Sequence, residues 1–356
     1  MDIRALRWLD PPAGPAIELL DQTRLPAEEV VVTCADVPGL VDAISRLVVR
    51  GAPLLGVAGA FGVALAACRG DDVAAAAAAI EAARPTAVNL GWGARRALAA
   101  YQRAPGPEAA RAALGEAVAI EAADAAASAA MAGHGLALVP PGARILTHCN
   151  TGALVSAGEG TAFAVIRAAH RAGRLAQLWI DETRPLLQGS RITAYEAGRA
   201  GMPHALLADA AAASLFAAGQ VDIVLIGADR IAADGSVANK VGSYSLAVLA
   251  RHHDVPFVVV APMSTVDFDT PDGAAITVER RSSGEVTSLA GIPLAPAGTT
   301  GYNPAFDVTP PGLITAIVTE RGVADPVTEG TLRVLGRGSS QRDCPQAVAY
   351  VERWGL

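Results

Sequence analysis

The chain has 356 residues, a formal net charge of −7 and a pI near 5.4, and it is long enough for one large domain or two modest ones. No block rich in lysine or arginine is present, so nucleic acid is not expected as the main partner. The four cysteines are far apart and form no CxxC pair, which argues against a zinc site or a disulfide framework. That cysteine usage and the lack of an apolar signal core at the start predict a cytoplasmic protein.

The first part of the chain predicts a small antiparallel sheet followed by helices. Short apolar stretches over residues 17–20 and 30–34 predict strands, and from Val37 onward the apolar residues recur at helical spacing. Helical segments continue to about Gly135. We therefore expect a smaller, mainly helical N-terminal domain over residues 1–138.

The longest uncharged run, residues 51–68, is near the lower length limit for a membrane-spanning helix. It contains Gly56, Gly59 and Gly62, whose spacing of three places them along one side of a helix, where another element can approach closely. We interpret this run as a buried helix of a soluble protein and expect no membrane partner.

The start of this helix is a candidate anion site. Proline is favoured at the first helical position, so Pro53 places Gly51 and Ala52 where their N–H groups are free to bind an anion. Arg50 adds a positive charge, and Arg84 stands beside a second helix start. The alternative is a tight turn whose arginine faces water.

From residue 144 onward, short apolar stretches recur about every thirty residues with helical segments between them, which is typical of a parallel, doubly wound sheet. The sequence therefore predicts an α/β fold, with a Rossmann-like catalytic domain over residues 139–356. The expected strands cover residues 145–146, 178–180, 205–207, 223–226 and 257–260.

Polar side chains follow the ends of these strands: Cys149 follows the first, Arg184 the second, Asp209 the third, and Asp229 and Arg230 the fourth. Because the carboxyl ends of parallel strands lie on one edge of a sheet, we expect these groups to converge on one crevice. Their mixed charges suit a charged polyol or a phosphate. Cys149 alone leaves two interpretations open, since a free cysteine is often buried and inert.

Other patterns exclude some cofactors and leave some residues ambiguous. No G-x-G-x-x-G follows a strand directly and no P-loop is present, so NAD and ATP are disfavoured. Asn239 and Lys240 precede an expected helix, where they either bind phosphate or sugar hydroxyls or act as a helix cap. His148 either tunes Cys149 or has a structural role.

Several motifs spread along the chain carry a family resemblance: Leu20-Asp21-Gln22, Arg50-Gly51-Ala52-Pro53, Arg84-Pro85-Thr86-Ala87-Val88-Asn89, Thr147-His148-Cys149-Asn150-Thr151-Gly152, Asp181-Glu182-Thr183-Arg184-Pro185 with Gln188-Gly189, Gly227-Ala228-Asp229-Arg230-Ile231 with Asn239-Lys240, and Asn303-Pro304-Ala305-Phe306-Asp307-Val308-Thr309. Together they resemble the methylthioribose-1-phosphate isomerases of methionine salvage. That family shares a superfamily with ribose-1,5-bisphosphate isomerases and the regulatory subunits of initiation factor 2B. The resemblance extends from about residue 17 to Val323.

The resemblance implies an isomerase in which Cys149 and Asp229 are catalytic. It also implies a small N-terminal domain on a Rossmann-like domain, a homodimer, and no need for a metal or a cofactor. The substrate contacts that it implies come from Arg50, Gly51, Ala52, Arg84, Gln188, Asn239 and Lys240.

The implied reaction converts 5-methylthio-D-ribose 1-phosphate into 5-methylthio-D-ribulose 1-phosphate. A sugar phosphorylated at C1 is a locked acetal, so an acid must protonate the ring oxygen as the C1–O bond breaks. Asp229 could be that acid if an apolar, closed site raises its pKa. Cys149 could then move a proton between C2 and C1, and a hydride route stays open beside this enolate route.

Two departures from the family pattern leave alternatives. Glu159 stands where relatives commonly carry an aromatic residue, so the substrate could instead be 5-deoxyribose 1-phosphate or ribose 1,5-bisphosphate. The tail after Ala324 lies outside the motifs, and a short closing helix is expected over residues 346–354. A remote alternative is a non-catalytic regulatory subunit, which would have no reason to keep both Cys149 and Asp229.

Overall fold

The computed structural model describes residues 4–84, 87–289 and 291–337, and the helix expected over 346–354 lies outside them. The chain divides into two compact units. The first falls within Met1–Ala130 and Thr151–Ala164, and the second within Met131–Asn150 and Val165–Leu356. The chain therefore leaves the second unit after Asn150, within the motif that contains Cys149, and returns to it within helix α6.

The first unit begins with a three-stranded antiparallel sheet in the order β1 (Leu6–Leu9), β2 (Ala16–Leu20), β3 (Val31–Cys34). β2 is the central strand, and its Ile17 and Leu19 are fully buried. The expected antiparallel sheet is confirmed, and β1 is a strand that the sequence pattern did not reveal. Its four residues lack a clear alternation, and pairing with β2 defines it as a strand.

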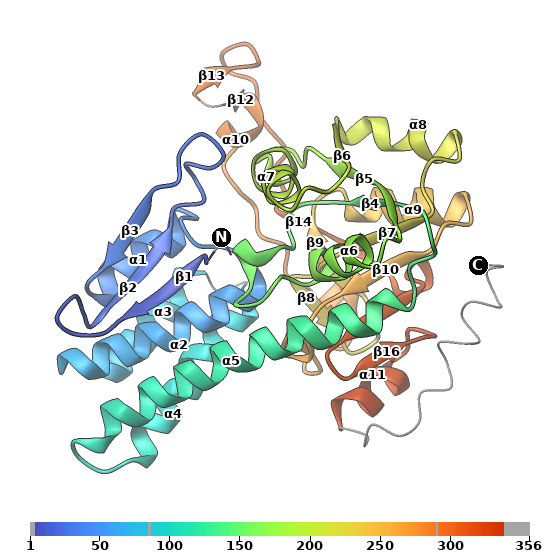
Figure 1. Ribbon diagram of the computed structural model, residues 1–356. Helices are drawn as coiled ribbons and strands as arrows, with labels where there is room; N and C mark the ends of the chain where they lie inside the picture. The colour runs from blue at the N-terminus through green and yellow to red at the C-terminus, as the bar shows by residue number, and fades with distance from the viewer. Residues whose placement is uncertain (1–3, 85–86, 290, 338–356) are drawn as a thin grey trace. The chain divides into compact units, whose positions relative to one another are not determined.

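Five helices follow the sheet, and the central one is the apolar run. Adding a Cβ to Gly93 would place it 1.9 Å from the Gly56 carbonyl oxygen, and one on Gly59 would lie 2.6 Å from the Leu90 oxygen. The glycines of α2 therefore let α4 pack against the helix backbone, as their spacing predicted. The helices are α1 (Val37–Ser45), α2 (Ala52–Arg69), α3 (Val73–Ala83), α4 (Val88–Arg103) and α5 (Glu108–Leu136), and the last turns of α5 belong to the second unit (Figure 1).

In the part of the chain that the structure describes, α2 alone is long and apolar enough to cross a membrane. Of that apolar window, 78% is buried inside the protein, as expected for the core helix of a folded domain. α2 is thus the buried helix that the sequence predicted.

The second unit is built on a seven-stranded sheet in the order β16-β15-β10-β7-β4-β5-β6. All neighbours are parallel except β16, which is antiparallel to β15, so the predicted Rossmann-like α/β fold is confirmed. Each predicted strand is present, whereas β15 and β16 were not predicted. The strands are β4 (Ala143–Thr147), β5 (Leu175–Asp181), β6 (His204–Leu207), β7 (Ile223–Ile226), β10 (Phe257–Val260), β15 (Ala316–Thr319) and β16 (Gly322–Ala324).

The order of these strands reverses between β4 and β7. From β4 the chain builds β5 and β6 to one side, and β7 then pairs with the other side of β4. Such a reversal is the topological switch point at which open α/β sheets bind ligands, at the carboxyl ends of the strands. Thr147, the last residue of β4, donates a hydrogen bond to the Leu225 carbonyl of β7 at 2.8 Å. The two strands that flank the switch point are therefore tied together at their carboxyl ends.

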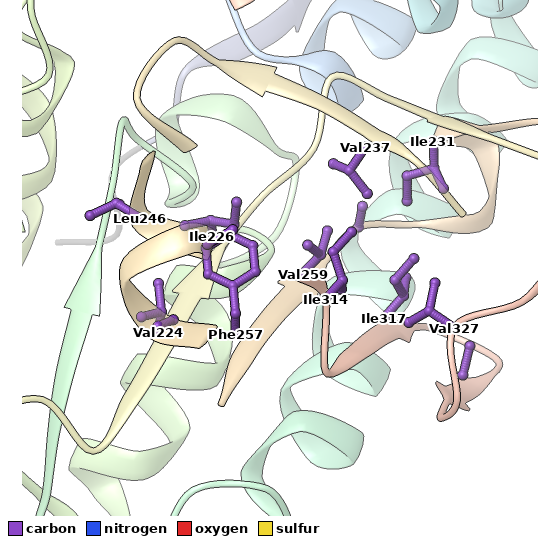
Figure 2. Close-up of a cluster of buried hydrophobic side chains, with 14 of the residues drawn as sticks. Val224, Ile226, Ile231, Val237, Leu246, Phe257, Val259, Ile314, Ile317 and Val327 are labelled. Atoms are coloured by element: carbon purple, nitrogen blue, oxygen red, sulfur yellow. The ribbon is translucent and has the colours of Figure 1, made fainter. Parts of the chain in front are cut away.

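A second, smaller sheet packs on the first through a common core. Its order is β11 (Val266–Asp267), β8 (Arg230–Ala232), β9 (Val237–Lys240), β14 (Phe306–Thr309). Figure 2 shows that its apolar side chains meet those of the large sheet and of helix α9 (Ser243–His252). The residues labelled there are Val224, Ile226, Ile231, Val237, Leu246, Phe257, Val259, Ile314, Ile317 and Val327.

The remaining elements of the second unit lie between or after these strands (Figure 1). A Cβ on Gly135 of α5 would lie 2.4 Å from a methyl group of Val165, so the end of α5 packs closely against α6. These elements are α6 (Ala162–Arg171), α7 (Ala194–Arg199), α8 (Ala212–Ala217), α10 (Gly284–Thr287), β12 (Ser288–Leu289), β13 (Ile292–Pro293) and α11 (Glu329–Gly336).

An ion pair aligns β4 with β7 at the opposite ends of these strands from Thr147. Arg144 donates its Nη2 and Nε atoms and its backbone N–H to the Asp222 carboxylate, at 2.6, 2.9 and 2.7 Å. Burial alone would raise the pKa of Asp222, but the hydrogen bonds and charge of Arg144 outweigh it and lower the pKa.

We predict that Asp222→Asn lowers the free energy of unfolding by about 1–2 kcal/mol at neutral pH, because a charged acceptor of three hydrogen bonds is lost. A carboxyl whose pKa is lower in the folded than in the unfolded protein stabilises above the unfolded pKa, and this effect is lost as the pH falls through the folded pKa. Urea unfolding between neutral and acidic pH should therefore show the difference shrinking at low pH. Asp42→Asn, in an exposed pair with Arg46, is the matched control and should change stability little.

Candidate active site

Cys149 lies just beyond the end of β4 in a backbone conformation that only a few residues adopt. Its φ is +61°, in the left-handed region that favours glycine, and the residue is 8% exposed. Its N–H donates to Oγ1 of Thr183 at 2.8 Å, and its carbonyl accepts from Oγ1 of Thr193 at 2.5 Å. Two threonine hydroxyls from the segment after β5 thus hold the backbone of Cys149 on both sides.

The loop after β5 is itself held in place by a carboxylate and by a close backbone contact. Thr183 has a φ of +64°, and the N–H groups of Thr183 and Arg184 both donate to the Asp209 carboxylate at 2.7 Å. A Cβ at Gly189 would lie 1.7 Å from the Asp181 carbonyl oxygen, so only glycine allows this close approach. Asp209 and Arg184 were expected in a crevice with Cys149. The Asp209 carboxylate and the Arg184 N–H instead fix the loop that holds the backbone of Cys149.

His148 directly precedes Cys149 in the chain and is buried. Its Nδ1 lies 3.0 Å from Oδ2 of Asp181, its Nε2 lies 2.9 Å from the Val241 carbonyl oxygen, and the side chains of His148 and Asp181 are each 1% exposed. Burial alone would lower the pKa of His148, but the hydrogen bond and charge of Asp181 outweigh it and raise the pKa.

Donor atoms of His148, Asp181 and Asp209 all lie within 4.8 Å of one another, which is a spacing that a metal ion could bridge. In the described residues, however, both nitrogens of His148 and both oxygens of Asp209 already form hydrogen bonds. The cluster is therefore a hydrogen-bond network that fixes backbone, in which Oδ1 of Asp181 has no hydrogen-bond partner among the described residues.

Asp229 follows β7, on the other side of the switch point from Cys149. It is half-buried, and its N–H donates to the Ala238 carbonyl at 3.0 Å, which joins it to β9 of the smaller sheet. Cys149 and Asp229 thus stand beyond the carboxyl ends of the neighbouring parallel strands β4 and β7. Of the residues expected to converge on one crevice, Cys149 and Asp229 are two that the strand order places next to each other.

Lys240 ends β9 and is held in a fixed position. Its ammonium donates to the Ala305 carbonyl at 2.9 Å and lies 5.0 Å from the centre of the Phe306 ring, a cation–π distance. β9 and β14 pair so that Lys240 faces Phe306. Asn239 donates to Oγ of Ser243, the first residue of α9, at 2.8 Å. The pair thus ends β9 and stands just before a helix, as expected.

Gln188 is a buried residue with an unsatisfied acceptor. The side chain is 3% exposed, and its Oε1 has no hydrogen-bond partner among the described residues. A buried acceptor without a partner is costly, so a donor from a bound molecule would stabilise it. This observation supports the expected role of Gln188 in binding.

The first unit carries the other predicted binding residues, Arg50, Gly51, Ala52 and Arg84. Gly51 has a φ of +94° and precedes α2, and a Cβ on it would lie 2.2 Å from that of Val155. Glycine is therefore required where this helix start meets the segment that follows the Cys149 motif. Within the same unit, Nε2 of Gln22 donates to the Leu154 carbonyl at 2.6 Å, so the last residue of the Leu20-Asp21-Gln22 motif contacts the segment after the Cys149 motif.

Comparison with known proteins decides the family. The model of the initiation factor 2 subunit family matches residues 48–326. A methylthioribose-1-phosphate isomerase from Pelotomaculum thermopropionicum is 50% identical over 334 residues, which is 90% of this chain and 92% of that protein. The chain belongs to the methylthioribose-1-phosphate isomerases. It is therefore an enzyme of the isomerase class, within the initiation factor 2 subunit family.

Solved structures agree with this assignment. The crystal structure of 5-methylthioribose 1-phosphate isomerase from Pyrococcus horikoshii OT3 has a TM-score of 0.86 at 39% identity, over 94% of this chain and 96% of that one. A structure described as translation initiation factor eIF-2B, subunit delta, from A. fulgidus has a TM-score of 0.80 at 38% identity, over 93% and 100% of the two chains. The fold of the isomerase is thus shared across the superfamily.

Glu159, the departure noted in the sequence, lies in a segment of this isomerase that is tied to α5. Its N–H donates to Oγ of Ser128 at 3.0 Å, and that hydroxyl donates to the Gly160 carbonyl at 2.7 Å. A Cβ on Gly158 would lie 2.5 Å from that of Ser128. Gly158 therefore allows the chain to pass close to α5, whereas a Cβ on Gly160 would lie 2.1 Å from the Thr151 carbonyl oxygen.

We predict that Thr193→Val lowers kcat of the isomerase by about ten- to a hundredfold, since it removes the donor that fixes the Cys149 carbonyl and loosens the corner. The free energy of unfolding should fall by about 1–3 kcal/mol, because the buried carbonyl loses this partner. Thr193→Ser keeps the hydroxyl and should remain close to the wild type in both measurements. Equal kcat values for the Val and Ser variants would show that this hydrogen bond does not position Cys149.

Proposed function

We propose that this isomerase converts 5-methylthio-D-ribose 1-phosphate into 5-methylthio-D-ribulose 1-phosphate in methionine salvage. The observation that carries the proposal is the placement of Cys149 and Asp229 beyond the carboxyl ends of β4 and β7, on either side of the switch point. The names of relatives that are about half identical to this chain support the choice of substrate.

Asp229 acts as the acid for ring opening. The phosphate on C1 locks the sugar as an acetal, so the ring C1–O bond breaks only if the ring oxygen receives a proton. Asp229 is half-buried where the chain passes from β7 of the large sheet to β8 of the small one. Donation of that proton breaks the bond between C1 and the ring oxygen. The ring oxygen becomes a hydroxyl, and C1 becomes an oxocarbenium that still carries the phosphate.

Cys149 moves the proton that converts the aldose into the ketose. As a base it removes the proton from C2, and the electron pair forms the C1=C2 double bond of an enol phosphate, which neutralises the positive charge at C1. Protonation of C1, with loss of the proton of the C2 hydroxyl, then gives the ketone at C2. A hydride shift from C2 to C1 reaches the same product with the same atoms. The rigid backbone of Cys149 serves either route, because the position of the thiol is fixed before the substrate arrives.

The remaining predicted residues bind the substrate. Arg50, Lys240 and the N–H groups of Gly51 and Ala52 bind the phosphate, since a helix N-terminus and two cations suit a dianion. Gln188 accepts a hydrogen bond from a sugar hydroxyl through its buried Oε1. Arg84 and Asn239 complete the set of polar contacts. We further propose that the enzyme acts in the cytoplasm as a homodimer without metal or cofactor, and that residues 1–138 and 139–356 form its two domains.

We predict that the wild type prefers 5-methylthioribose 1-phosphate over 5-deoxyribose 1-phosphate and ribose 1,5-bisphosphate, measured side by side as ketose formation. Cys149→Ala and Asp229→Asn should each abolish turnover, because each removes a proton-transferring group. Preference for another of these sugars would leave the proposed reaction type intact but assign the enzyme to a different pathway. Glu159 would then be the first residue to substitute in order to change the substrate preference. Turnover that survives in both variants would refute the site, and lack of turnover of all three sugars would show that this isomerase acts on a different substrate.

We predict that Arg50→Ala raises KM for the phosphorylated sugar by about ten- to a hundredfold, while kcat changes less, because a charge-assisted contact to the phosphate is lost. Arg46→Ala, which removes an exposed arginine four residues earlier, should leave KM unchanged. An unchanged KM in Arg50→Ala would place the phosphate elsewhere.

A further inference from the structure

His148 links two parts of the candidate site that are far apart in the sequence. Through Nδ1 it contacts Asp181, two residues before the threonine that holds the N–H of Cys149. Through Nε2 it contacts the carbonyl of Val241, the residue after Lys240. One buried ring thus joins the turn that carries the thiol to the strand end that carries the lysine.

The chemistry of the two partners fixes the role of the ring. A backbone carbonyl can only accept, so Nε2 of His148 must carry a proton to bond Val241. Nδ1 donates to Oδ2 of Asp181 when that carboxyl is ionised. Burial raises the pKa of Asp181, and the hydrogen bond and charge of His148 oppose that rise. A ring that donates from both nitrogens makes two charge-assisted bonds, which are stronger than bonds between neutral groups.

The surroundings of the ring are built to hold it in one place. A Cβ on Gly242 would lie 2.8 Å from Cε1 of His148, and Gly242 has a φ of +110°, so only glycine allows the ring to pack there. The Asp307 carboxylate accepts from the N–H groups of Gly242 and Tyr244 at 2.7 and 3.1 Å. The ionisable groups that influence His148 are therefore Asp181, Asp209 and Asp307, all of them acidic.

We propose that His148 is a positioning residue that donates from both ring nitrogens, with Nδ1 fixing the Cys149 turn through Asp181 and Nε2 fixing the Asn239–Lys240 strand end through Val241. The two bonds then serve different steps. The Asp181 side affects the position of the thiol and hence kcat, whereas the Val241 side affects Lys240 and hence the binding of the phosphate. The raised pKa of His148 agrees with a ring that keeps both protons at neutral pH.

Two amide substitutions separate the two bonds. The amide nitrogen of glutamine can take the place of Nε2, so His148→Gln keeps the bond to Val241 and loses the one to Asp181. The amide nitrogen of asparagine can take the place of Nδ1, so His148→Asn keeps Asp181 and loses Val241. We expect about a tenfold lower kcat with little change of KM in the glutamine variant, and about a tenfold higher KM with little change of kcat in the asparagine variant, the weight of one hydrogen bond each.

Two controls accompany the kinetics. His148→Ala, which keeps neither bond, should show both defects, and the matched substitutions His252→Gln and His252→Asn on an exposed histidine should show none. Equal effects of glutamine, asparagine and alanine on kcat and KM would overturn the proposal, because a merely structural histidine would not separate the two constants.

The kinetic predictions for His148 rest on the proposed function, because they assume that sugar phosphate as the substrate. A measurement without substrate tests the His148 proposal independently. Alkylation of Cys149 by iodoacetamide, followed at that peptide by mass spectrometry, should be faster in His148→Gln than in the wild type and unchanged in His148→Asn. This arm reads the position of the thiol whether or not the sugar proposed above is the substrate. Equal alkylation rates in all variants would refute the Asp181 half of the proposal.

Nuclear magnetic resonance of the wild type with ¹⁵N-labelled histidine needs no variant that might unfold the site. We expect protons on both ring nitrogens of His148 at neutral pH, protected from exchange with solvent, and the signals are assigned by their loss in His148→Asn. A ring nitrogen of His148 without a proton at neutral pH would overturn the proposal even if the kinetic variants fail to fold.

Discussion

The left-handed backbone of Cys149 is the constraint on which the candidate site depends. A non-glycine residue in this conformation costs about 1–3 kcal/mol and persists only where the surroundings over-determine it. Here the surroundings are the hydroxyls of Thr183 and Thr193, which bond the N–H and the carbonyl of the same residue. Both threonines lie after β5, so the pairing of β4 with β5 sets the position of the thiol. The strain is thus carried by a parallel strand pair rather than by a free loop.

The smaller sheet has a different role, which is to hold a buried lysine side chain in one position. Lys240 is 8% exposed, and a buried ammonium is unfavourable unless its donors find acceptors. The Ala305 carbonyl and the Phe306 ring provide them, because β14 pairs with β9 in the register that places Phe306 opposite Lys240. A lysine that is already immobilised loses less rotamer entropy when it meets a phosphate. The motif over residues 303–309 therefore positions Lys240, which lies 65 positions before Ala305 in the chain.

The sequence allowed the fold class and the places of Cys149 and Asp229 after two strands to be predicted, but not the contacts that hold these residues. Strand positions follow from apolar runs, so every predicted strand of the large sheet is present, whereas strand order depends on how the crossovers pack. The strands of the smaller sheet escaped prediction because they are two to four residues long and partly polar, as Arg230 and Lys240 show. Threonines and aspartates such as Thr193 and Asp209 carry no local pattern, because their partners are distant in the sequence. Asp209 was expected among the groups of the crevice, and its carboxylate instead binds the amides of the Thr183 loop.

A fold that isomerases share with initiation factor subunits cannot by itself decide what a member does. The switch point between β4 and β7 offers the same crevice to any chain with this strand order, and the tie between Thr147 and Leu225 concerns only the alignment of the two strands. Chemistry requires more than the crevice: a thiol and a carboxyl at the two strand ends, each fixed before a substrate arrives. A chain that only assembled with partners would gain nothing from a strained cysteine, a buried lysine and an unsatisfied glutamine, all of which lower its stability. The costly features of the second unit therefore support the proposed active site, and they single out the residues whose loss we expect to remove activity.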